Sequence, residues 1–119
     1  MVFILDDSPE RIAFFQSIFG NDMDYAHNVS AALNMLRSRK YDMIFLDHDL
    51  SENDPGAASG STLADILEEE KLHTNIPIII HSMNPVGAQN IQRTLNNTHS
   101  QVVVVPYSVL KARLEQRML

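Results

Sequence analysis

Four short runs of the chain are apolar at every position. Polar residues directly follow the first three runs, and a segment with helical spacing comes after each of the four. The runs cover residues 2–5, 43–46, 77–80 and 102–105. A strand with one solvated face alternates apolar and polar residues, whereas a strand of a parallel sheet with helices on both faces is apolar throughout. The runs therefore predict parallel strands that are covered on both faces.

Helix signals fill the segments between these runs. Ser8-Pro9 and Asn84-Pro85 each place a capping residue before a proline, and Gly20 is typical of a helix end. The spacing of apolar residues predicts helices over about residues 9–19, 30–39, 62–71, 85–95 and 108–118, a weaker strand over residues 24–27, and a polar loop over residues 51–61. Five strand-helix units predict an α/β domain, a three-layer sandwich around a parallel sheet.

Length and charge narrow the class of protein further. A chain of 119 residues suits one domain, residues 1–119. The formal net charge of -6, with only nine Lys and Arg, argues against wrapping a nucleic acid. The chain contains no cysteine, which excludes disulfides and thiolate metal sites. No stretch resembles a secretory signal or a membrane span of about 20 residues, so we expect a cytoplasmic protein without membrane contact.

Polar residues gather where three of the predicted strands end. They are Asp6 and Asp7, then Asp47, His48 and Asp49, and finally His81 and Ser82. Ligands of an open parallel sheet bind beyond the carboxyl ends of its strands. We therefore expect these side chains to form one polar site.

The carboxylates of this site predict a bound cation. Two carboxylates about 6 Å apart repel by roughly 3 kcal/mol at an effective dielectric near 20, and several such pairs would burden a marginally stable domain. We expect Asp6, Asp7 and Asp47 to hold a divalent metal ion. Oxygen ligands favour Mg²⁺ or Mn²⁺, and histidine coordination would shift the preference toward Zn²⁺.

The histidines of the site suit proton transfer to and from a phosphate ester. Histidine titrates near neutral pH, so His48 and His81 are candidates for the base and the acid. The helix that begins after Asn84 would aim free N–H groups at a phosphate, and Gly87 in its first turn would allow close approach. The other three histidines, for which we expect solvent exposure, are His27, His73 and His99.

The layout resembles the receiver domain of response regulators over nearly the whole chain. Asp6 and Asp7 match its metal-binding acid pair, Asp47 its phospho-acceptor, and Ser82 its hydroxyl residue after strand four. The resemblance implies a flavodoxin-like sheet with strand order 2-1-3-4-5. Receivers carry a lysine before the proline at the end of strand five, whereas this chain has valine at position 105.

Two further stretches resemble the receiver-derived family of cyclic-phosphate-processing receiver domains. They are residues 47–50, Asp-His-Asp-Leu, and residues 81–90, with His-Ser-x-Asn-x-x-Gly-x-x-Asn spacing. The resemblance implies metal-dependent hydrolysis or binding of a cyclic phosphate or cyclic nucleotide. The implied catalytic residues are His48, His81 and Asp47, and the implied substrate-binding residues are Arg11, Ser82, Asn84, Gly87, Asn90 and Asp49.

Two other functions remain open at this point. The valine in place of lysine favours a pseudo-receiver that binds a protein partner and performs no chemistry. A receiver phosphorylated on Asp47 is the second alternative. Any protein partner of such a lone receiver-like domain would be encoded separately.

Overall fold

Five parallel strands form one sheet in the computed structural model, which describes residues 1–50 and 58–117. The order is β2-β1-β3-β4-β5, which confirms the predicted fold. The strands are β1 (Val2–Leu5), β2 (Met23–Ala26), β3 (Met43–Leu46), β4 (Ile78–Ile80) and β5 (Val102–Val104). Most of the predicted loop, residues 51–57, and the predicted helix end at residue 118 lie outside the described residues.

A helix follows each strand, as predicted. The helices are α1 (Pro9–Phe19), α2 (Val29–Ser38), α3 (Gly60–Glu70), α4 (Pro85–Leu95) and α5 (Tyr107–Arg117). The predicted caps are present, because the Asn84 side chain accepts a hydrogen bond from the Gly87 N–H at 3.1 Å and Ser8 accepts one from the Arg11 N–H at 3.3 Å. The α3 helix begins two residues earlier than predicted, with Ser59 as its N-cap.

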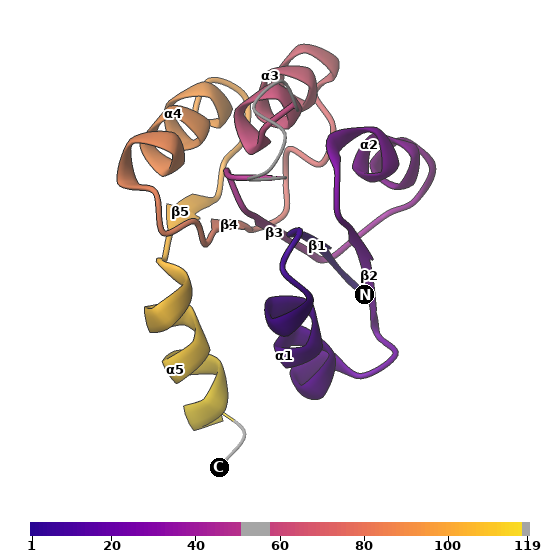
Figure 1. The fold of residues 1–119 in the computed structure, drawn as a ribbon. Helices are drawn as coiled ribbons and strands as arrows, with labels where there is room; N and C mark the ends of the chain where they lie inside the picture. The colour runs from indigo at the N-terminus through magenta and orange to yellow at the C-terminus, as the bar shows by residue number, and fades with distance from the viewer. Residues whose placement is uncertain (51–57, 118–119) are drawn as a thin grey trace.

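Two apolar cores explain the uninterrupted apolar runs. The α2, α3 and α4 helices cover one face of the sheet, and α1 and α5 lie on the other (Figure 1). Along β3, Ile44 and Leu46 join the first core, whereas Phe45 joins the second. Burial of each such side chain contributes about 1.5–3 kcal/mol, so both faces of the central strands stabilise the fold.

The last strand departs from the prediction that it is covered on both faces. Val102 and Val104 pack against the first core, but Val103 is 48% exposed. The reason is its position, since β5 forms one edge of the sheet. An apolar run at a sheet edge therefore does not imply two covered faces.

The prediction that three histidines are solvent-exposed is wrong for His99, which is 4% exposed. Its Nε2–H donates a hydrogen bond to the Leu72 carbonyl at 2.6 Å. The partly buried His73 donates to the Leu36 carbonyl at 2.7 Å. The Leu36 carbonyl belongs to the last turn of α2, where carbonyls lack helical partners, and the Leu72 carbonyl lies in the turn just after α3. His27 is exposed, as predicted.

The structure also bears on membrane contact. Within residues 1–50 and 58–117, no helix is both long enough and apolar enough to cross a bilayer.

Candidate functional site

The register of the sheet brings Asp6, Asp47 and His81 together at its carboxyl edge. Leu5 pairs with Leu46 across β1 and β3, and a polar residue follows each of them. The Asp47 N–H donates to the Leu5 carbonyl at 3.0 Å, and the His81 N–H donates to the Leu46 carbonyl at 2.9 Å. One potential ligand atom of each polar residue lies within 4.8 Å of the other two. The predicted convergence of three strand ends is therefore present for these residues.

The three side chains of this group, the acid-histidine cluster, are buried. Asp6 and His81 have no exposed surface, and Asp47 is 4% exposed. Asp6 accepts hydrogen bonds from His81 Nε2 at 2.8 Å and from the Ser8 N–H at 2.9 Å. Because a carboxylate only accepts, the His81 proton facing Asp6 is on Nε2. His81 Nδ1 is buried and has no hydrogen-bond partner among the described residues, a rare condition for a buried polar atom.

Arg11 places a positive charge between the two acids of the cluster. Its Nη1 lies 3.7 Å from Asp6 Oδ2 and 3.7 Å from Asp47 Oδ2. The guanidinium also lies 4.6 Å from the centre of the Tyr107 ring, a cation–π contact. Arg11 therefore lies with the two acids at this edge of the sheet.

Tyr107 is a site residue that the sequence reasoning missed. Its ring contacts Arg11 from one side and lies 6.3 Å, centre to centre, from the His81 ring. Burial raises the pKa of its phenol above the ordinary value of 10.0. The sequence holds no local signal for this residue, since the residues before it, Val105 and Pro106, are both apolar.

The surroundings of Asp47 disfavour the ionised form of its carboxyl group. Burial raises the pKa of its carboxyl above the ordinary value of 3.8, and the neighbouring charge of Asp6 raises it further. The charges of His81 and Arg11 act in the opposite direction. In the folded protein the ionised carboxylate is therefore held at a cost in stability.

Replacing Asp47 with asparagine should raise the Tm of the metal-free protein at pH 7. A folded pKa above the unfolded value means that the wild-type carboxyl costs stability as the pH rises from about 4 through the folded pKa. Asparagine has no such cost, so the difference in Tm between the variant and the wild type should vanish below pH 4. Thermal unfolding in EDTA across this range checks the prediction, with exposed Asp65→Asn as the control. A lower Tm for the Asp47→Asn protein at pH 7 would contradict it.

His48 lies beside the cluster, with its orientation fixed by Asp49. Its backbone N–H donates to Asp47 Oδ1 at 2.8 Å, and its Nδ1–H donates to Asp49 Oδ1 at 2.7 Å. The Asn84 side-chain amide donates to the same Asp49 oxygen at 3.2 Å. The hydrogen bond from His48 lowers the pKa of Asp49 below its ordinary value. With Nδ1 committed, a neutral His48 ring carries its free lone pair on Nε2, and 20% of the side chain is exposed.

Two glycines allow helices to approach this edge closely. A Cβ on Gly87 would lie 2.4 Å from Cγ of the His48 ring, and a Cβ on Gly60 would lie 2.1 Å from the Asp47 carbonyl oxygen. The sequence predicts that Gly87 makes room for a phosphate, whereas the structure places the His48 ring against it. The close approach at Gly60 joins α3 to the end of β3, and no pattern in the sequence reveals it.

The remaining predicted site residues differ in placement. Asp7 is partly buried next to Asp6 but does not belong to the acid-histidine cluster. Ser82 is buried, and its hydroxyl accepts a hydrogen bond from the Asn84 N–H at 3.0 Å. Asn90 is exposed on α4, and its side chain forms no hydrogen bond with any described residue. The structure thus connects Ser82 and Asn84 to the site and leaves Asn90 at its periphery.

Comparison with protein-family models decides the family. The model of the cyclic-phosphate processing receiver domain matches residues 1–97. The chain belongs to this family. The match confirms the resemblance seen in the sequence. The matched range contains every site residue that the sequence predicts.

Solved receiver domains share the fold of this cyclic-phosphate processing receiver domain. The receiver domain of NtrX from Brucella abortus has a TM-score of 0.69 and 20% identity, over 99% of this chain and 94% of that one. The receiver domain of the Francisella response regulator 1452 has a TM-score of 0.65 and 22% identity, over 99% of this chain and 98% of that one. The response regulator TrrA from Thermotoga maritima was solved in complex with Mg²⁺-BeF. It has a TM-score of 0.66 and 21% identity, over 97% of this chain and 96% of that one. No curated protein sequence matches the chain.

The acid-histidine cluster fits a hard divalent cation. Asp6 and Asp47 offer carboxylate oxygens, the ligands that Mg²⁺ and Mn²⁺ prefer. His81 directs its Nε2–H at Asp6, so in this arrangement Nε2 has no lone pair for a metal ion. The donor set therefore favours an oxygen-binding cation over Zn²⁺.

Proposed function

We propose that this chain is a metal-dependent phosphoesterase that binds and hydrolyses a cyclic phosphate or cyclic nucleotide at the Asp/His edge of its sheet. The observation that carries the proposal is the position of His48. Its ring is partly exposed, is oriented by Asp49, and follows directly on the buried acid Asp47. A proton-transfer group is thus held beside a site that suits a cation.

Positive charge for the phosphoryl oxygens has two sources in this proposal. A divalent cation held by Asp6, Asp7 and Asp47 would stabilise the charge that develops on those oxygens. Arg11 already lies between Asp6 and Asp47, and its contact with Tyr107 orients the guanidinium. Arg11 therefore supplies the second positive charge, and a planar guanidinium binds phosphate oxygens well.

His48 transfers the proton during hydrolysis. The neutral ring accepts a proton from the attacking water at Nε2, the water oxygen bonds to phosphorus, and the ring P–O bond of the cyclic phosphate breaks. Asp49 stabilises the imidazolium through its 2.7 Å hydrogen bond. The proton then passes to the oxygen that leaves, and the product is a phosphate monoester.

His81 positions Asp6 in this scheme. It has no exposed surface, so its ring does not reach a substrate in this arrangement, and its Nε2–H holds Asp6 at 2.8 Å. Both steps of proton transfer, from the attacking water and to the leaving oxygen, are therefore assigned to His48. Roles in substrate binding for Ser82, Asn84, Gly87 and Asn90 remain proposals drawn from the family resemblance.

A receiver phosphorylated on Asp47 is the second candidate, because the fold and the position of this acid at the end of β3 are those of receivers. Incubation with acetyl phosphate separates the two functions. A hydroxylamine-labile increase in mass on Asp47, absent from the Asp47→Asn protein, would favour the receiver. Lack of such an adduct together with hydrolysis of a cyclic phosphate favours the phosphoesterase.

Product analysis by mass spectrometry tests the proposed hydrolysis. The purified chain is incubated with Mg²⁺ or Mn²⁺ and with 2',3'-cyclic nucleotides, 3',5'-cyclic nucleotides, cyclic oligonucleotides and ADP-ribose-derived cyclic phosphates. We expect one class to be converted to the monoester. Retention of an unchanged ligand would make the protein a sensor, and inertness toward the whole panel would favour the protein-binding pseudo-receiver.

A further inference from the structure

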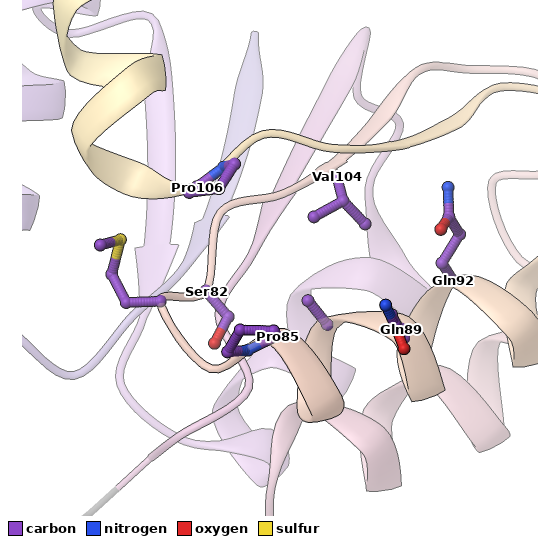
Figure 2. A pocket seen from close by; sticks show the side chains of 8 residues that line it. Ser82, Pro85, Gln89, Gln92, Val104 and Pro106 are labelled. Atoms are coloured by element: carbon purple, nitrogen blue, oxygen red, sulfur yellow. The ribbon is translucent and has the colours of Figure 1, made fainter.

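A groove lies between α4 and the end of β5, next to the Asp/His edge. Its volume is about 350 Å³. In Figure 2, Pro85, Gln89 and Gln92 of α4 form one wall, and Val104 and Pro106 form the other. Apart from Ser82, none of the residues of the acid-histidine cluster and its neighbours described above lines this groove.

The chemistry of the groove suits a neutral planar ring. None of the described residues that line it is charged, so a phosphate has no counter-charge there. The rings of Pro85 and Pro106 offer apolar surfaces, and the 53% exposed Met83 adds a polarisable thioether at the mouth. Most small-molecule pockets combine such apolar walls with a few polar groups that fix orientation.

The polar groups of this groove are two side-chain amides. Gln89 and Gln92 lie three residues apart, so they share one face of α4. Gln92 Nε2 approaches the Val102 carbonyl at 3.5 Å, which leaves its Oε1 as an acceptor. Gln89 is exposed and offers both a donor and an acceptor. Paired amides of this kind match the donor and acceptor edge of a nucleobase.

We infer that the groove binds the heteroaromatic base of a cyclic mononucleotide whose phosphate binds at the Asp/His edge. The inference rests on the proposed function. Ser82 connects the groove to the Asp/His edge, because it lines the groove and directly follows His81 of the cluster. One ligand therefore has its charged end at the acids and its neutral end on α4.

The size of the groove narrows the substrate class. At about 350 Å³ it lies near the lower end of the roughly 300–1,000 Å³ typical of ligand pockets. This space holds one base with part of its sugar. The inference therefore selects cyclic mononucleotides over cyclic oligonucleotides.

Binding measurements with three probes test the inference. Titrations by NMR follow the side-chain amide signals of Gln89 and Gln92 as adenosine 2',3'-cyclic phosphate, adenosine, or glycerol 1,2-cyclic phosphate is added in the presence of Mg²⁺. We expect the nucleotide and adenosine to shift these signals, and the base-free phosphate to leave them unchanged. The double variant Gln89→Ala/Gln92→Ala should bind the nucleotide about tenfold more weakly and the base-free phosphate equally well.

The controls separate this inference from the proposed hydrolysis. Both substitutions replace solvent-accessible helix residues with the best helix former, so the fold should persist, and Gln16→Ala on α1 is the matched variant that should change nothing. Equal binding of the nucleotide and the base-free phosphate by the wild type, or an unaltered double variant, would overturn the groove as a base site. Hydrolysis of base-free phosphates alongside that result would leave the proposed function standing.

Discussion

Replacing His48 with glutamine should lower the rate of cyclic phosphate hydrolysis by about 10²–10⁴-fold, the usual contribution of a positioned general base. Glutamine cannot accept a proton near neutral pH, so the attacking water loses its base. The ring of His48 packs on Gly87 at the surface of the domain and is not part of either core. The Tm should therefore change little. Initial rates at saturating substrate measure the effect as kcat.

A second histidine provides the control for this variant. His73 lies on the segment that leads into β4, at the opposite edge of the sheet, and has a positive φ of 56°. Asparagine tolerates that backbone conformation, so His73→Asn should fold and keep wild-type turnover. If the His48→Gln protein retains full kcat, His48 is not the base and the proposed mechanism fails.

Substituting Gly60 with alanine should destabilise the domain by about 1–2 kcal/mol and also abolish most of its activity. The new Cβ would lie 2.1 Å from the Asp47 carbonyl oxygen and 2.9 Å from His48 Cα. Alanine favours a helix over glycine by about 1 kcal/mol, but overpacking against backbone costs about 1–3 kcal/mol or more. The cost of the clash therefore exceeds the gain in helix propensity. Relief of the clash displaces the segment that carries Asp47 and His48.

Gly20 offers a matched control for this second variant. It has a φ of 61°, and a Cβ there would meet nothing within 4 Å. The Gly20→Ala protein should lose about 1 kcal/mol through backbone strain while its turnover stays unchanged. Urea unfolding and kcat are measured for both variants. A Gly60→Ala protein with wild-type stability would show that α3 does not press on the Asp47–His48 backbone.

The parallel sheet could be predicted because its signal is local. Residues such as Ile44 and Phe45 point to opposite faces, and each meets a helix, so both had to be apolar. The exposed Val103 could not be predicted in the same way. Its exposure depends on the position of β5 in the sheet and on the packing of α5. The run of four valines contains no information on either.

The candidate site was predictable to the extent that strand ends define it. Asp6, Asp47 and His81 follow three adjacent strands, and the parallel register alone brings them together. The contact of Tyr107 with Arg11 joins residues from the first and last helices, so no spacing rule reveals it. The complete burial of His81 likewise arises from the packing of distant rings, including that of Phe15, rather than from its neighbours in sequence.

The most direct test of the central claim is the effect of metal removal on hydrolysis. The initial rate of cyclic phosphate opening is measured for the wild-type protein as purified, after EDTA, and after Mn²⁺ is restored. We expect EDTA to abolish the rate, Mn²⁺ to restore it, and the Asp47→Asn protein to remain inactive throughout. A rate that EDTA leaves unchanged, or an Asp47→Asn protein with wild-type turnover, would contradict the account of a metal-dependent phosphoesterase at this edge of the sheet.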